Sequence, residues 1–107
     1  MTHQEFTHSF ETLVTKMREM LLKKGRDYAN EDAMSNFKRI GLVTDQTPEK
    51  VILTFTASKV SRLCNLMEKG AKPENEPIQD NMLDLACYSM LLYAMNDETT
   101  NLKNDKK

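Results

Sequence analysis

Apolar side chains recur every three or four residues through most of the chain, which is the spacing of one face of an α-helix. The pattern predicts long helices over residues 4–24, 48–69 and 78–95, and a short helix through residues 34–40. No segment shows the alternation of apolar and polar residues that is typical of a β-strand. We therefore expect an all-α protein, a small bundle of three long helices and a short one.

Local chemistry marks several of the helix ends. Thr47, Pro48 and Glu49 form a strong start, because Thr suits the N-cap, Pro the first helical position and an acid the first turn. Glycines stand near the ends of the predicted helices, and we expect Gly41 to close the short helix and Gly70 the helix that begins at Pro48.

The C-terminal part of the chain changes character after residue 95. The helix over residues 78–95 is apolar around most of its circumference, which is typical of a helix at the centre of a bundle or at a subunit interface. We therefore expect a homo-oligomer, most simply a homodimer. Beyond it, residues 96–107 are almost entirely polar. The sequence thus predicts a single helical domain over residues 1–95 and a disordered polar tail.

Composition narrows the class of protein. Fifteen basic and sixteen acidic residues leave a net charge of −1, so there is no basic field to attract nucleic acid, and we expect no nucleic-acid partner. No apolar run approaches the roughly 20 residues of a membrane span, and the first residues lack a signal-peptide pattern. We expect a cytoplasmic protein with no membrane partner, in which Cys64 and Cys87 are free thiols.

Four charged residues stand on the apolar faces of two predicted helices. Lys59 and Arg62 lie on the strip that also carries apolar residues of the helix over 48–69, and Asp80 and Asp84 do the same in the last helix. Charges are seldom left in such places unless they are paired, bind a metal or face a ligand. The pattern indicates a charged site inside a helical core.

The acidic residues suggest a metal site. Glu76, Asp80 and Asp84 are four residues apart, so their carboxylates share one helical face and repel one another without a cation. Mg²⁺ prefers carboxylate oxygens and would relieve this repulsion. In the alternative interpretation, Asp80 interacts with the helix dipole and Asp84 pairs with Lys59 or Arg62.

The basic residues suggest a phosphate site. Arg62 offers a fork of donors and Lys59 a point charge, both suited to phosphate. Equally, the two side chains could lay their aliphatic stems on the core and extend their charged ends to water.

A third candidate element precedes these helices. Lys24, Asp27 and Tyr28 lie in a segment that breaks helical periodicity, and Asp32 and then Asn36 and Phe37 follow shortly after. Aromatic rings can stack on a base and an Asn can bond to a base edge. Alternatively, the rings anchor a loop to the core and the Asp and Asn side chains cap helices.

Together these motifs resemble the family called nucleotide modification associated domain 1, small proteins common in phages and bacterial genomes. The resemblance covers roughly residues 8–95 and depends on an ordered set of motifs: Lys24-Gly25-Arg26-Asp27-Tyr28, Asn36-Phe37, Lys59 with Arg62, and Glu76, Asp80 and Asp84. That family looks like a distant relative of the all-α nucleotide pyrophosphohydrolases, the MazG and dUTPase-like group. Those enzymes bind Mg²⁺ with helix carboxylates and cleave nucleoside triphosphates to monophosphate and pyrophosphate.

The resemblance implies a role in nucleotide metabolism or base modification. Taken with the chemistry of the candidate residues, it leads us to expect three roles for them. Lys59, Arg62 and Lys24 would hold phosphates, and Tyr28, Asn36 and Phe37 would contact the base or sugar. Asp80 and Asp84, with Glu76 and Asp27, would hold Mg²⁺.

One departure bears on catalysis. The enzymes carry Glu-x-x-Glu on one helix and Glu-x-x-Asp on the next, whereas this chain lacks the first motif and spaces its second acidic group by four. Fewer carboxylates weaken metal binding and leave no evident second metal. The expectation is therefore a nucleotide-binding protein, either a Mg²⁺-dependent pyrophosphohydrolase or a binding protein that sequesters nucleotide without turnover. The remaining hypothesis is a structural module with a buried ion network.

Overall fold

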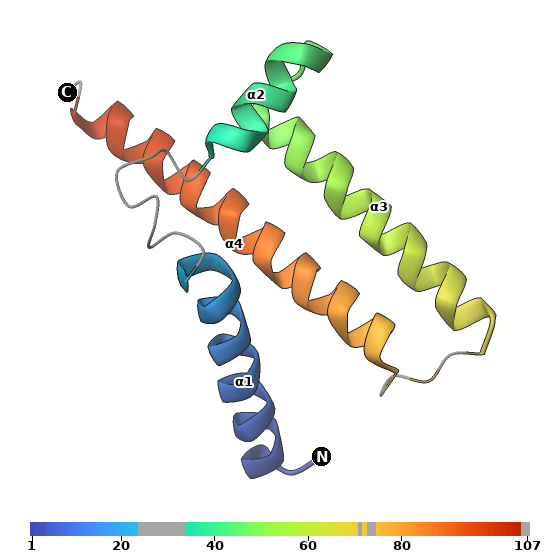
Figure 1. Ribbon diagram of the computed structural model, residues 1–107. Helices are drawn as coiled ribbons and strands as arrows, with labels where there is room; N and C mark the ends of the chain where they lie inside the picture. The colour runs from blue at the N-terminus through green and yellow to red at the C-terminus, as the bar shows by residue number, and fades with distance from the viewer. Residues whose placement is uncertain (24–33, 71, 73–74, 106–107) are drawn as a thin grey trace. The chain divides into compact units, whose positions relative to one another are not determined.

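A computed structural model describes residues 1–23, 34–70, 72 and 75–105 of the chain. In this part of the chain the regular elements are four α-helices and one short π-helix, with no strand (Figure 1). The all-α prediction is therefore confirmed. By its internal contacts the chain divides into two compact units, residues 1–33 and residues 34–107, which are considered separately. The single domain predicted over residues 1–95 stays a prediction.

The first unit contains α1 (His3–Arg18), which runs directly into the π-helix η1 (Glu19–Lys23). A capping box starts α1: the Glu5 amide donates to Thr2 Oγ1 at 3.0 Å, and the Thr2 amide donates to Glu5 Oε2 at 2.9 Å. This reciprocal pair satisfies two amides that have no partner within the helix. Elements α1 and η1 together match the helix predicted over residues 4–24 to within a residue at each end.

The second unit begins with α2 (Ser35–Thr44), which is longer than predicted because Gly41 does not end it. The helix closes instead at Asp45, whose φ of 56° is left-handed. Gly41 is buried inside α2, and a Cβ there would collide with the carbonyl oxygen of Gln46. The Gln46 amide donates to the Gly41 carbonyl at 2.8 Å, so the turn after α2 folds back onto the glycine. Close backbone approach, and not helix termination, therefore accounts for glycine at this position.

The next helix, α3 (Pro48–Glu68), begins where the sequence predicts. Thr47 is the N-cap and its side chain accepts a hydrogen bond of 3.3 Å from the Lys50 amide, while Pro48 occupies the first turn. The helix ends one residue before the predicted end. Gly70 follows with a φ of +82°, a conformation that glycine adopts without strain.

The last helix, α4 (Glu76–Asp105), is longer than predicted at both ends. It begins two residues early, and the Asn75 carbonyl accepts from the Gln79 amide at 3.1 Å. It then continues through residues 96–105, where the polar composition predicted a disordered tail. No glycine or proline occurs after Pro77 to interrupt a helix, which is the local reason that the backbone can continue.

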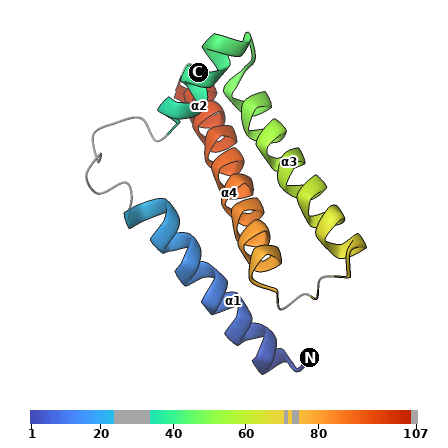
Figure 2. The ribbon, with the colours of Figure 1, turned by 45° about the vertical axis from the view of Figure 1, so that its right-hand side comes forward.

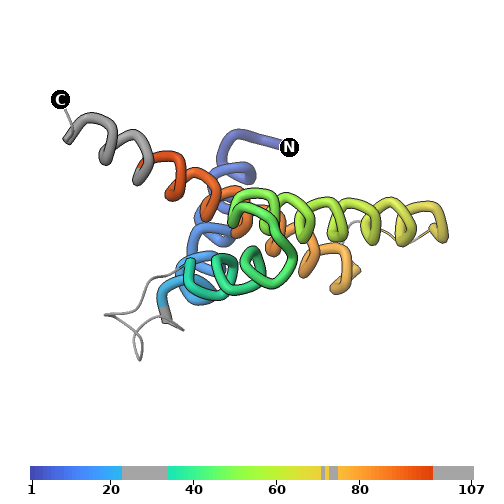
Figure 3. The backbone as a smooth tube through the Cα atoms, turned by 90° about the horizontal axis from the view of Figure 1, so that it is seen from above, coloured from blue at the N-terminus to red at the C-terminus, as the bar shows by residue number. Residues whose placement is uncertain are grey.

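Helices α3 and α4 lie side by side and run in opposite directions (Figures 1 and 2). Two contacts define how they are aligned: Phe55 meets Tyr88 with ring centroids 6.1 Å apart, and Lys59 meets Asp84. Four residues forward along α3 therefore correspond to four residues back along α4. Seen from above, α3 extends away from α2 (Figure 3).

The apolar core lies where α2 meets α3 and α4. Met34, Ile52 and Met95 are buried together there, and partly buried residues pack against them: Phe37, Tyr88, Leu91, Leu92 and Ala94. Phe37 also meets the ring of Phe55 at 6.0 Å. Ile52 has no exposed surface, so this cluster excludes water from the end of the α3–α4 pair nearest α2.

Of the helices whose residues the structure describes, none combines the length and the apolar character that spanning a bilayer requires.

Candidate binding site

A polar pocket of about 450 Å³ lies between α3 and α4, beyond the apolar core. Both helices line it, and the residues are Lys59, Arg62, Asn65 and Leu66 from α3, with Pro77, Asp80, Asn81 and Asp84 from α4. Pockets that hold small ligands have volumes of roughly 300–1,000 Å³. The pocket is thus large enough for a compact metabolite, and all four charges that the sequence placed on apolar helix faces line it.

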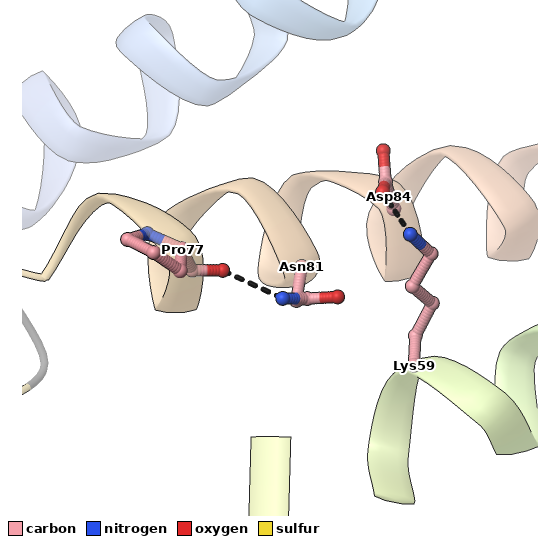
Figure 4. A network of polar contacts seen from close by, with 4 residues as sticks. All are labelled: Lys59, Pro77, Asn81 and Asp84. Atoms are coloured by element: carbon pink, nitrogen blue, oxygen red, sulfur yellow. Dashed lines mark hydrogen bonds and ion pairs between the residues drawn. The ribbon is translucent and has the colours of Figure 1, made fainter. Parts of the chain in front are cut away.

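Lys59 and Asp84 form an ion pair across the pocket. Lys59 Nζ lies 2.8 Å from Asp84 Oδ2, and the two side chains are only 23% and 28% exposed (Figure 4). This confirms the interpretation in which Asp84 pairs with a basic side chain of the neighbouring helix, and it identifies that side chain as Lys59 and not Arg62. Because the pair is partly shielded from water, it interacts more strongly than an exposed pair would.

Arg62 and Asp80 differ from this pair in being exposed. Neither has an ion-pair partner within the part of the chain that the structure describes, so a guanidinium and a carboxylate at the pocket remain open to a ligand. With the Lys59–Asp84 pair, the pocket carries two positive and two negative formal charges. Its charges therefore cancel, which favours a ligand that brings both signs, such as a phosphate with its cation.

Asn81 is the most deeply buried polar residue at the pocket, with 4% of its surface exposed. Its Nδ2 donates to the Pro77 carbonyl at 2.6 Å, one helical turn earlier (Figure 4). Its Oδ1 is buried and has no hydrogen-bond partner among the described residues. An unsatisfied buried acceptor costs about 1–3 kcal/mol, so the pocket holds a polar group that would gain by meeting a donor.

Cys87 lies on the turn of α4 that follows Asp84 and is buried. Burial raises the pKa of the Cys87 thiol above its ordinary value of 9.0, and the negative charge of Asp84 adds to the effect. Both causes disfavour the thiolate. Cys87 is therefore a protonated, poorly nucleophilic thiol near neutral pH, and Cys64 is a free and exposed one.

The predicted metal ligands are only partly brought together. Asp80 and Asp84 line the pocket, whereas Glu76 is exposed in the first turn of α4 and is not among the lining residues. Among the side chains that the structure describes, no three from His, Cys, Asp or Glu gather closely enough to hold a metal ion. Two carboxylates still fit Mg²⁺, which commonly takes one or two and completes its shell with water and phosphate oxygens.

The remaining predicted site residues do not line the pocket or lie outside the described residues. Lys24, predicted to hold phosphate, Asp27, predicted to help hold Mg²⁺, and Tyr28, predicted to contact the base or sugar, lie outside the described residues. Asn36 is exposed on α2, and Phe37 packs in the apolar core against Phe55. The Phe37 ring thus lies in the core, as the alternative interpretation expected. Its stacking on a base stays a prediction.

The sequence reasoning missed four residues of the pocket, Asn65, Leu66, Pro77 and Asn81, and of these Asn81 is both polar and buried. The signal was present, because Ile78, Asn81, Leu85, Tyr88, Leu92 and Met95 follow the alternating three- and four-residue spacing of a helix seam. An amide in an otherwise apolar seam is as unusual as a charge there. Its importance depends on the orphaned Oδ1, which only coordinates reveal.

Comparisons of the chain with protein-family models, with curated proteins and with solved structures give no match.

Proposed function

We propose that the protein binds a nucleotide in the polar pocket between α3 and α4. The observation that supports this is the gathering of Lys59, Arg62, Asp80 and Asp84 around one cavity of about 450 Å³. Arg62 supplies the bidentate donors that suit a phosphate, and Lys59 adds a positive charge behind it. The resemblance of the chain to nucleotide modification associated domain 1 points to the same ligand class.

Mg²⁺ enters this proposal as the partner of the phosphates. Asp80 would hold the ion, and Asp84 would also bind it once the Lys59 side chain had moved away. Phosphate oxygens and water would complete the coordination shell. A phosphate with bound Mg²⁺ is nearly neutral, and so is the pocket as a whole. The ion, when bound, would supply charge neutralisation at the phosphates.

Turnover distinguishes the two forms of the proposal. As a pyrophosphohydrolase, the protein would direct water onto a phosphoanhydride with a carboxylate as base. As a sequestering protein it would bind without cleaving. The pairing of Asp84 with Lys59 at 2.8 Å favours the second form, because a carboxylate that is already neutralised is a weaker base and a weaker metal ligand.

Calorimetric titration of nucleoside mono- and triphosphates, with and without Mg²⁺, tests binding. We expect Arg62→Ala to weaken binding about tenfold or more, because a charge-assisted contact to phosphate is lost. Lys50→Ala is the matched control, since Lys50 is an exposed cation on α3 that does not line the pocket. If no nucleotide binds, or if both variants weaken binding equally, the proposed site is wrong.

A pyrophosphate assay with the same triphosphates separates the enzyme from the binding protein. Mg²⁺-dependent release that Asp80→Asn abolishes would establish the enzyme. Tight binding with no release would establish sequestration.

We also propose that the protein is a homo-oligomer, as the sequence predicts. Supporting this, α3 carries a second apolar stripe on exposed positions, spaced alternately by four and three: Leu53, Ala57, Val60, Cys64 and Met67. Leu53, Val60 and Met67 remain 53%, 46% and 49% exposed. This spacing is that of a helix seam, and exposed seams of this kind mark interaction surfaces.

Light scattering after size exclusion measures the oligomer directly. Val60→Glu places a charge in the middle of the stripe and should yield a monomer, while Ser58→Glu, on an exposed position of α3 outside the stripe, should not. A wild-type protein that is monomeric at high concentration would refute the oligomer.

A further inference from the structure

The orphaned oxygen of Asn81 carries information about what the pocket binds. Asn81 is 4% exposed and lines the pocket, and its Oδ1 has no hydrogen-bond partner among the described residues. Figure 4 shows Nδ2 directed at the Pro77 carbonyl and Oδ1 directed away from it. Because a carbonyl can only accept, the 2.6 Å contact requires the nitrogen on that side, and the acceptor is left for something else.

The surroundings of Asn81 change along the pocket. The alignment of α3 with α4 places Leu66 near Pro77 at one end of the pocket and the Lys59–Asp84 pair at the other. Asn81 lies between Pro77 and Asp84 along α4. The same alignment sets Arg62 level with Asn81, and Asp80 precedes Asn81 on α4, so the charges are not confined to one end. A base laid on Leu66 would bring its edge to Asn81 and leave Arg62 and the ion pair for the phosphates and their cation.

We propose that the pocket selects a nucleotide whose base carries an exocyclic amino group, which donates to Asn81 Oδ1. This rests on the proposed nucleotide-binding function and adds its base class: a base with an exocyclic amino group, as in cytosine, adenine or guanine, in preference to uracil or hypoxanthine. In uracil and hypoxanthine a carbonyl oxygen stands in place of the amino group of cytosine and adenine, and it would face the Asn81 acceptor. The ring N–H of either base could approach Oδ1 only together with the carbonyl beside it, and Asn81 has no donor to offer that carbonyl because Nδ2 is held by Pro77. Oδ1 is covered in the free protein, so binding includes a small shift of the lining side chains.

Two matched pairs of ligands test the proposal by calorimetry on the full chain. CMP and UMP differ in the group at position 4 of the base, and AMP and IMP in the group at position 6. We expect the amino member of at least one pair to bind about tenfold or more tightly than its keto partner, because the keto member leaves the buried acceptor unpaired.

Asn81→Leu assigns the preference to this residue. Leu has the same number of side-chain heavy atoms and the same branch at Cγ, completes the apolar seam of α4 and removes the acceptor, so the variant should fold and bring the two affinities within about twofold of each other. Gln79→Leu is the control, since Gln79 is an exposed amide of α4 that does not line the pocket; it should preserve the wild-type ratio.

The outcomes distinguish the base preference from nucleotide binding itself. Equal affinities within both pairs, or a preference that survives in Asn81→Leu, would overturn the base assignment and leave nucleotide binding intact. Failure of all four ligands to bind, together with the triphosphates, would overturn the function and the base assignment with it.

Discussion

The two ends of the α3–α4 pair use the same helices for opposite purposes. At the end nearest α2, Ile52 and Met95 are buried in an apolar cluster. At the other end, Lys59, Asn81 and Asp84 occupy the corresponding inward positions around a pocket. One backbone arrangement thus supports a close-packed end and an end that gives up packing for polar groups. Stability and ligand binding should accordingly respond to different substitutions.

Truncation of the apolar end should have the largest effect on stability. Ile52 has no exposed surface, so Ile52→Ala removes buried methylenes and leaves a cavity at a cost of about 2–5 kcal/mol. Leu42→Ala, at a position of α2 that is 85% exposed, should cost well under half as much. Urea denaturation followed by circular dichroism measures both. Similar losses from the two variants would contradict the placement of the core.

The ion pair at the polar end should contribute less. Asp84→Asn leaves the partly buried Lys59 ammonium without its partner and should cost about 1–3 kcal/mol. Replacing both partners with apolar residues, as Lys59→Met with Asp84→Leu, should recover most of that loss. Unfolding free energies of Lys59→Met, of Asp84→Leu and of the double variant give the coupling directly. The exposed Asp80→Asn serves as the control and should cost a few tenths of a kcal/mol through the helix dipole.

Removing the buried amide should stabilise the polar end. Asn81→Leu eliminates an unsatisfied acceptor and extends the apolar seam, for an expected gain of about 1 kcal/mol. The gain would appear as a higher urea midpoint with an unchanged slope. A loss of stability would mean that Asn81 has a partner in solution and is not an orphaned group.

The smallest expected effect is a dependence on alkaline pH. Since the pKa of Cys87 is raised in the folded protein, the unfolded chain loses this proton first as the pH passes 9.0. The contribution of Cys87 to stability is therefore complete below that pH and declines as the pH rises toward the folded pKa. Cys87→Ala should flatten the stability curve between about pH 8 and about pH 10.

Cys64→Ala is the matched control for that pH dependence, because it removes a thiol that is exposed. Asp84→Asn should flatten the curve in part, since its charge is the second cause of the raised pKa. Identical curves for Cys87→Ala and the wild type would show that the thiol does not contribute.

The sequence predicted those features that depend on local chemistry or on helical periodicity. The Thr47 cap of α3 is one, because cap and first-turn preferences act within a few residues. The meeting of Lys59 with Asp84 is another, because both stand on the inward strips of their helices. Periodicity alone could not choose between Lys59 and Arg62 as the partner of Asp84. That choice depends on how the two helices are aligned along their lengths.

Other features depend on contacts that no local pattern encodes. Gly41 was expected to end a helix, but its role is to admit the Gln46 backbone from the following turn. Polar composition led to a disordered tail after residue 95, although nothing in that segment forbids helix. Asn81 lies on a seam that the sequence already shows, but only the missing hydrogen-bond partner of its Oδ1 distinguishes it from an ordinary buried amide.

The spacing of polar groups along α4 also resists slippage of the two helices. Sliding α4 by one turn in one direction would carry Asp84 to the ring of Phe55, and in the other would bring Tyr88 to Lys59. Either move would strand a charge against an aromatic neighbour, whereas a seam of uniform leucines would tolerate the shift at little cost. The polar groups that make this end less stable thus also fix how α3 and α4 are aligned along their lengths.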